Sequence, residues 1–128
     1  MIHYLSAADL YSINEDVLGE RPHVRDRHLL RSAARRPTLM LFGEETFPSI
    51  LDKAAAVLHS LAYHHLFGDG NKRTATRAVI RFLHENGLDV TWESTAAESF
   101  ILEIAQGRHE VPDIARWLSC HTVSHTDD

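Results

Sequence analysis

Ten consecutive residues, His65 to Thr74, carry most of the side chains in this sequence that could do chemistry. They read His-Leu-Phe-Gly-Asp-Gly-Asn-Lys-Arg-Thr. The imidazole of His65 can accept a hydroxyl proton near neutral pH. The carboxylate of Asp69 is an oxygen ligand of the kind that Mg²⁺ takes from proteins. Lys72 and Arg73 offer a point charge and a planar guanidinium, both of which suit phosphate.

The elements that must position these side chains are two helices joined by a tight loop, because an apolar periodic segment precedes the ten residues and another follows them. The first amides of a helix have no partner within it, and the helix dipole favours an anion there. Gly70 and Asn71 are therefore expected to bend the backbone so that its amides face phosphate oxygens. Cations in a first helical turn are disfavoured by about 0.3–1 kcal/mol each, and a bound polyanion would offset this.

Spacing alone does not assign these roles. A histidine at the end of a buried helix face is more often a core residue, and Gly-Asp-Gly is good turn sequence without any metal. From spacing alone, the better interpretations are therefore a core residue for His65 and a turn residue for Asp69. The adjacent His64 receives no role.

The order of the residues, however, resembles the signature of the Fic/Doc family. In the nucleotidyl-transferring Fic branch this signature reads His-x-Phe-x-Asp/Glu-Gly-Asn-Gly-Arg, and in the Doc branch, the death-on-curing toxins, it ends in Asn-Lys-Arg. Residues 71–73 follow the Doc form. Residues 24–37, 53–62 and 114–118 also look like segments of this family, so the resemblance covers roughly residues 1–120.

The resemblance implies transfer of a phosphate from ATP, with Mg²⁺, to a hydroxyl of a translation factor, elongation factor Tu being the family's known target. His65 would take the proton of that hydroxyl, and Asp69 would hold the Mg²⁺ ion. Phe67 would anchor the loop. The phosphates would be bound by four consecutive residues, Gly70, Asn71, Lys72 and Arg73.

Two departures from the Fic pattern favour phosphate transfer over AMP transfer. Lys72 stands where Fic enzymes have glycine, and Thr76 stands where they have a second arginine. Arg77 comes one position later, about 100° further round the helix, and with Arg81 it is interpreted as part of a solvated face. AMP transfer to a protein hydroxyl is the alternative function. A catalytically inactive module that binds an antitoxin or another partner is the second alternative.

Many Fic proteins are held inactive by a helix with the pattern Ser/Thr-x-x-x-Glu-Gly/Asn. Ser94 and Glu98 have the first spacing, but Ser99 follows them, and Thr95 with Glu98 matches a capping box instead. The sequence therefore predicts no internal inhibitor. The expected partner is a separate antitoxin chain of the Phd type.

Composition limits the class of protein. The 128 residues suit one domain, and 44% apolar with 24% charged residues is ordinary for a globular chain. A formal charge of −5 argues against direct nucleic-acid binding. The single cysteine, Cys120, cannot form an internal disulfide, and no segment reads as a signal peptide or membrane span. We therefore expect a cytoplasmic protein.

The periodic pattern predicts an all-α single domain of about six helices, with at most a short β-hairpin flap, spanning residues 1–120. Residues 121–128 are polar and are expected to form a disordered tail. Ser6 and Asp9 predict a capping box for the first helix. The expected helices are 6–18, 25–36 ended by Pro37, 49–65 with His65 on its buried face, 71–86, 95–106 and 112–118; residues 38–47 could be a strand pair or a loop, and 88–92 are short and extended.

Overall fold

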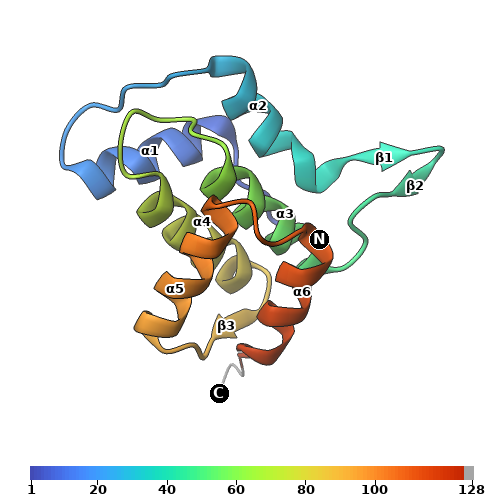
Figure 1. Cartoon of the computed structure of the whole chain (residues 1–128). Coiled ribbons are helices and arrows are strands. Elements are labelled where there is room, and N and C mark those ends of the chain that lie inside the picture. Colours follow the sequence, from blue (N-terminus) through green and yellow to red (C-terminus); the bar gives the residue numbers. More distant parts are fainter. Residues whose placement is uncertain (126–128) are drawn as a thin grey trace.

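The computed structural model describes residues 1–125, which form six α-helices, one 3-10 helix and two antiparallel strand pairs (Figure 1). The elements are α1 (Ala7–Leu18), α2 (Arg27–Arg35), the 3-10 helix η1 (Arg36–Thr38), β1 (Met40–Leu41), β2 (Glu44–Glu45), α3 (Ile50–Tyr63), α4 (Asn71–Glu85), β3 (Leu88–Val90), α5 (Ser94–Ala105), α6 (Val111–Cys120) and β4 (Thr122–Ser124). The predicted all-α class with about six helices and a short hairpin is confirmed.

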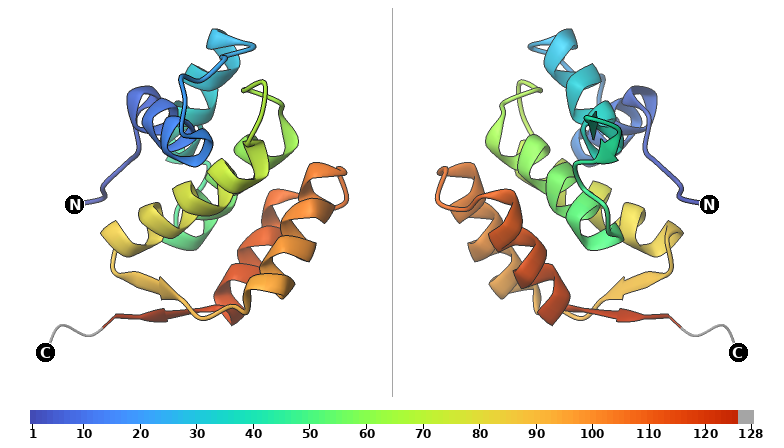
Figure 2. Two further views of the ribbon diagram at one scale, coloured as in Figure 1. Left: turned by 90° about the vertical axis from the view of Figure 1, so that its left-hand side faces the viewer. Right: turned by 90° about the vertical axis from the view of Figure 1, so that its right-hand side faces the viewer.

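Helix α3 forms the centre of the domain and packs against α4, α5, α6 and η1. Its residues 53–58 are buried on every side of the helix, as expected for a helix that runs through a core. Three consecutive alanines at 54–56 let the neighbouring helices approach closely. Figure 2 shows α3 and α4 running together through the middle, with α1 and α2 on one side and α5 and α6 on the other.

Local capping signals set the starts of two helices. The Ser6 hydroxyl accepts a hydrogen bond from the Asp9 amide at 3.1 Å, and the Asp9 carboxylate accepts one from the Ser6 amide at 2.8 Å, so the predicted capping box is confirmed. Ser49 and Asp52 form a second box at the start of α3. Both helices therefore begin where the sequence supplies its own cap.

The second helix differs from the prediction at both ends. It begins at Arg27, because the Asp26 carboxylate caps it by accepting from the Leu29 amide at 3.0 Å. Arg25 lies outside the helix, and its amide donates to the motif segment instead. The α-helix ends at Arg35, two residues before Pro37, and the chain continues as the 3-10 helix η1. Pro37 lies in the first turn of η1, where its missing amide hydrogen would have had no helical partner.

The segment between η1 and α3 forms a β-hairpin, in which Met40 pairs with Glu45 and Leu41 with Glu44. The hairpin projects away from the helices (Figure 1). At its tip Phe42 has a positive φ of 51°, and its side chain is 97% exposed. The segment therefore takes the strand-pair form of the two that the sequence left open.

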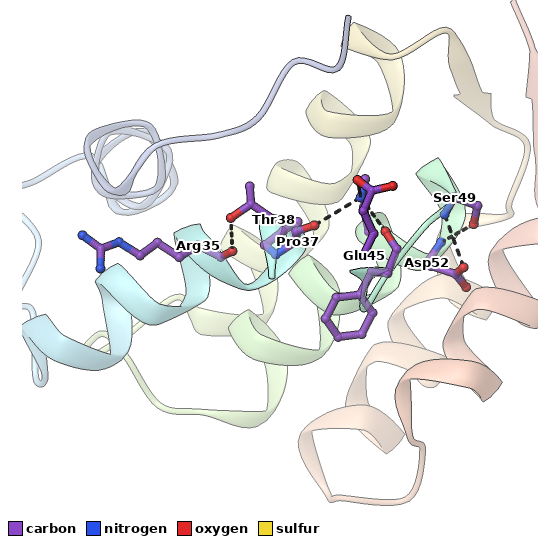
Figure 3. A network of polar contacts seen from close by, with 8 residues as sticks. Arg35, Pro37, Thr38, Glu45, Ser49 and Asp52 are labelled. Atoms are coloured by element: carbon purple, nitrogen blue, oxygen red, sulfur yellow. Dashed lines mark hydrogen bonds and ion pairs between the residues drawn. The ribbon is translucent and has the colours of Figure 1, made fainter. Parts of the chain in front are cut away.

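A buried lysine attaches this hairpin to the helices. The side chain of Lys53, on the first turn of α3, is fully buried. Its ammonium donates to Glu45 Oε1 at 3.0 Å, to the Phe47 carbonyl at 2.5 Å and to the Pro37 carbonyl at 3.3 Å. Figure 3 shows this network, which joins the end of η1, the second hairpin strand and α3. Each ammonium proton has an acceptor, as a buried charge requires.

Two predictions near the C-terminus are wrong. Helix α5 begins at Ser94 and has no side-chain cap: the Thr95 hydroxyl donates to Glu93 Oε1 at 2.6 Å, so the predicted capping box of Thr95 and Glu98 does not form. The predicted disordered tail, residues 121–128, is also wrong for residues 121–125, because residues 122–124 form β4 and pair with β3. Backbone pairing needs no apolar side chains, which is why the polar sequence did not reveal it. Residues 126–128 lie outside the described part.

Both ends of the described chain are attached at the C-terminal end of α4. The side chain of Asn86 accepts from the His3 amide at 2.8 Å and donates to the His3 carbonyl at 2.9 Å. The His125 amide donates to the Gly87 carbonyl at 3.1 Å. In the described residues, no helix has the length and apolar character that crossing a membrane requires.

Candidate active site

The candidate residues lie on the loop of residues 64–70 between α3 and α4, here called the motif loop, and on the first turn of α4. Two backbone hydrogen bonds attach this loop to the segment before α2. The Arg25 amide donates to the Leu66 carbonyl at 2.8 Å, and the Gly68 amide donates to the His23 carbonyl at 2.9 Å. They flank an isolated antiparallel bridge between Val24 and Phe67. The loop is therefore held in place by a distant part of the chain.

The side chain of Asn71 closes the motif loop from inside. Its amide nitrogen donates to the Phe67 carbonyl at 2.9 Å, and its oxygen accepts from the Phe67 amide at 3.1 Å. The Phe67 side chain is 1% exposed and belongs to the hydrophobic core. Asn71 thus shapes the loop with its side chain, while its own backbone amide stays at the start of α4.

Gly70 occupies a position that disfavours other residues on two grounds. Its φ is +74°, in the left-handed region. A Cβ there would lie 3.1 Å from Leu18 Cδ2, 3.2 Å from Val17 Cγ1 and 3.3 Å from Asn14 Nδ2. The turn into α4 therefore packs directly against α1.

Asn14 is a residue of this site that the sequence analysis missed. It is fully buried, and its amide nitrogen donates to the Asp69 carbonyl and to Thr74 Oγ1, both at 3.0 Å. Its own oxygen has no hydrogen-bond partner within residues 1–125. The available signal was a polar residue beside Leu10 and Ile13 on the apolar face of a predicted helix.

The start of α4 presents amides without partners. The first hydrogen bond into this helix is donated by Thr74 to the Gly70 carbonyl, at 2.9 Å, and Gly70 supplies no side-chain cap. The amides of residues 71–73 therefore donate to no group in residues 1–125. Such a terminus attracts an anion through both its free donors and its dipole.

Exposed charged side chains surround these amides. Lys72 and Arg73 are both exposed, and neither forms an ion pair within the described residues; one Arg73 nitrogen lies 3.4 Å from the Val17 carbonyl. Asp69 is exposed as well, and its Oδ1 accepts from the Gly70 amide at 2.7 Å. Its other oxygen accepts no hydrogen bond within residues 1–125. The site thus combines an excess of positive charge with one carboxylate oxygen that could bind a cation.

His65 differs from the prediction in its position. Helix α3 ends at Tyr63, because His64 takes an extended conformation with φ −89° and ψ 132°. His65 therefore lies on the motif loop and is exposed, not on a buried helix face. The structure places it on the same loop as Asp69, with its side chain exposed to solvent.

A groove of about 570 Å³ continues from the start of α4 and runs between α4 and α5. The groove is lined both by the cationic residues Lys72 and Arg73 and by apolar residues such as Trp92 and Ile101. Its lining residues are Lys72, Arg73, Thr76, Arg77, Ile80, Trp92, Ser94, Ala97, Glu98, Ile101 and Leu102. Arg77, predicted as part of a solvated face, is exposed and lines this groove.

A second cavity of about 400 Å³ lies between α2, η1 and α3. One nitrogen of Arg36 donates to His59 Nδ1 at 2.8 Å and to Ser60 Oγ at 3.0 Å, and the guanidinium lies over the Phe47 ring at 5.6 Å. Burial, helped by the Arg36 charge, lowers the pKa of His59. A lowered pKa favours the neutral imidazole, which can accept from the guanidinium. The sequence analysis assigned these residues no such contact.

Asp69 is the residue of the motif loop whose carboxylate could bind Mg²⁺. Mg²⁺ bound with a nucleotide takes one or two protein carboxylates and fills its remaining positions with phosphate oxygens and water. One exposed carboxylate beside a phosphate-attracting helix start fits that demand. Within residues 1–125 the motif loop holds no group of three His, Cys, Asp or Glu side chains converging on one point.

Comparison with known proteins shows the family of this chain. A model of the Fic/DOC family matches residues 4–83, which include α1, the motif loop and most of α4. A protein named Toxin Doc, from Mycolicibacterium smegmatis (strain ATCC 700084 / mc(2)155), is 37% identical over 121 residues, and the alignment covers 93% of each chain. The match spans more than half of the sequence in both comparisons. The chain therefore belongs to the Fic/DOC family, as its motif indicated.

Proposed function

We propose that this chain is a Doc-type toxin that transfers the γ-phosphate of ATP to a hydroxyl of a protein target. The observation that carries the proposal is the set of three amides at the start of α4 that have no partner within residues 1–125, flanked by the exposed side chains of Lys72 and Arg73. A polyphosphate supplies the negative charge that this helix start lacks. The groove beside Lys72 gives a nucleotide room next to the phosphate site.

In the proposed reaction the target hydroxyl approaches His65, whose exposed imidazole accepts its proton. The hydroxyl oxygen forms a bond to the γ-phosphorus as the bond from that phosphorus to the bridging oxygen breaks, and ADP leaves with its electron pair. The amides of residues 71–73, with Lys72 and Arg73, stabilise the negative charge on the phosphates. Asp69 is the residue that would hold Mg²⁺, which neutralises phosphate charge when bound.

Phosphate transfer is preferred to AMP transfer because of two residues on α4. Lys72 brings a side chain and a charge to the position where AMP-transferring relatives have glycine. Thr76, at the position of their second arginine, donates its hydroxyl to the Lys72 carbonyl at 2.9 Å and carries no charge. Lys72 reduces the room, and Thr76 the number of arginines, available for a nucleotide bound in the AMP-transferring orientation.

The target class and the partner are part of the proposal. The Doc form of the motif, residues 71–73, is the ground for a translation factor resembling elongation factor Tu as the target. The name Toxin Doc of the 37% identical relative is the ground for a Phd-like antitoxin as the inhibitor. Glu98 lines the groove but forms no ion pair within residues 1–125, which agrees with an inhibitor supplied by another chain.

The test is intact-mass analysis of elongation factor Tu after incubation with the protein, ATP and Mg²⁺. The expected product gains one phosphate and the reaction releases ADP. The His65→Ala variant should give no product, while His28→Ala, at an exposed histidine on α2, should act like the unmodified protein. A gain of one AMP that depends on His65 would replace phosphate transfer with AMP transfer. Absence of any adduct on cytosolic proteins, with ATP still bound, would favour an inactive binding module.

A further inference from the structure

Three potential metal ligands converge at the end of α4 opposite the motif loop. His84 lies on the last turn of α4, Asp89 lies on β3, and His125 follows β4. One ligand atom from each residue lies within 4.8 Å of the other two. The pairing of β3 with β4 brings them together, because Asp89 stands opposite Val123 in the strand register. Figure 2 shows the two strands side by side at the base of the molecule.

We propose that His84, Asp89 and His125 bind one Zn²⁺ ion, which joins the end of the chain to α4. This site is separate from Asp69: residues 71 and 84 are about 20 Å apart along the helix, at 1.5 Å per residue. Two imidazoles and one carboxylate make a donor set typical of zinc sites that keep an open coordination position. Mg²⁺ and Ca²⁺, which prefer oxygen ligands alone, would bind there poorly.

One of the two ligand distances already suits zinc, and a rotation of His84 can bring the other into range. Ligands about 2.0–2.2 Å from a tetrahedral ion are separated from each other by about 3.3–3.5 Å. Here His125 Nδ1 lies 3.4 Å from Asp89 Oδ2, within this range. His84 Nδ1 lies 2.8 Å from the other oxygen, Asp89 Oδ1, at a hydrogen-bond distance that would lengthen when an ion enters. The two imidazole rings are 5.0 Å apart between centroids. The His84 side chain is 68% exposed, so it can rotate to complete the geometry without disturbing the core.

A second observation also points to a ligand. The Nδ1 atom of His125 is enclosed by the protein and has no hydrogen-bond partner within residues 1–125, since its orientation toward Asp89 does not form a hydrogen bond. Buried polar atoms are normally satisfied, and those that are not call for an unrecorded water or ion. A Zn²⁺ ion would use this nitrogen. Without an ion, Asp89 forms a hydrogen bond with His84 but not with His125.

The test is calorimetric titration of the full-length, metal-free protein with Zn²⁺, with Mg²⁺ as comparator. We expect one Zn²⁺ per chain and a higher melting temperature with Zn²⁺ present. Replacing a residue that merely hydrogen-bonds to a metal ligand typically lowers metal affinity about 10–100-fold. Replacing a ligand itself should cost no less, so His84→Ala and His125→Ala should each lower the affinity for Zn²⁺ at least about tenfold. The control His28→Ala should bind as tightly as the unmodified protein.

A spectroscopic measurement separates this site from other ways of binding zinc. X-ray absorption of the zinc-loaded protein should show nitrogen and oxygen ligands only; a sulfur ligand would place the ion at Cys120 and overturn the proposal. Binding that survives both His84→Ala and His125→Ala would overturn it as well, as would no binding at all. Because His84 is exposed, its variant should unfold at an unchanged temperature without zinc, so lost binding can be distinguished from lost folding.

Discussion

Replacing Lys53 with methionine tests how the hairpin is held to the helices. Methionine matches the length of the lysine stem, so Lys53→Met removes the charge and the three donated hydrogen bonds with little change in packing. The acceptors left behind are the carbonyls of Pro37 and Phe47 and the carboxylate of Glu45.

The expected loss of unfolding free energy is about 2–4 kcal/mol. Removing one partner of a buried ion pair costs about 3–5 kcal/mol when the other charge stays buried. Here the Glu45 side chain is 46% exposed and can regain water, which lowers the cost. The two carbonyls lose charge-assisted bonds worth about 1.5–3 kcal/mol each, partly offset because the ammonium no longer needs to be desolvated.

The companion variant Glu45→Gln separates the ion pair from the carbonyl contacts. Glu45→Gln keeps an oxygen that can accept from the ammonium but leaves the buried charge of Lys53 without a counter-charge, so it should cost about 1–2 kcal/mol, less than Lys53→Met. Urea unfolding of both variants measures the two losses. If Glu45→Gln destabilises the protein as much as Lys53→Met, or if Lys53→Met changes stability by less than about 1 kcal/mol, the carbonyl contacts do not hold the hairpin as argued.

Three further variants test the site and its surroundings. Gly70→Ala should cost about 1–3 kcal/mol from its left-handed backbone and its crowding against α1, and should lower transfer activity; an unchanged urea midpoint would contradict the turn geometry. Asn14→Ala should cost about 1–3 kcal/mol and weaken ATP binding measured by calorimetry, because Asp69 and Thr74 lose a buried donor; normal stability and affinity would show that this contact does not position α4. The pKa of His59 is lowered in the folded protein, so below the ordinary pKa of 6.5 the unfolded chain binds more protons than the folded one. The contribution of His59 to stability should therefore be constant above pH 6.5 and be lost as the pH falls through the folded-state pKa. His59→Gln should remove this contribution from the pH dependence of the melting temperature, and an unchanged pH dependence would assign it to other groups.

Sequence alone predicted those features that neighbouring residues determine. The capping box of Ser6 and Asp9 spans one helical turn, so its residue types sufficed to place the start of α1. Thr95 and Glu98 have the same spacing but form no box, because the chain is already helical at Ser94. A capping box therefore needs both the right residue types and a first residue with an extended, non-helical backbone, which Ser6 has and Thr95 does not.

The features that sequence did not predict depend on contacts between distant residues. No glycine or proline marks the end of α3, and the loop that carries His65 is attached through Arg25, about forty positions earlier in the chain. Asn14 reaches the motif loop from α1, and β4 forms only because β3 is beside it. The order of residues in the motif could therefore predict which residues belong to the candidate site. Their exposure, and the hydrogen bonds from distant residues that hold the loop, could be seen only in the three-dimensional structure.

The attachment of both chain ends at Asn86 and Gly87 has a consequence for protein engineering. Since His3 and His125 bind adjacent residues, a linker could join the two ends and new ends could be opened at the hairpin tip, between Phe42 and Gly43. Such a circular permutant would keep α3, the motif loop and α4 as one uninterrupted segment. His3 and His125 themselves lie at the far end of α4, about 20 Å along the helix from its first turn, so joining the chain there would leave the motif loop untouched.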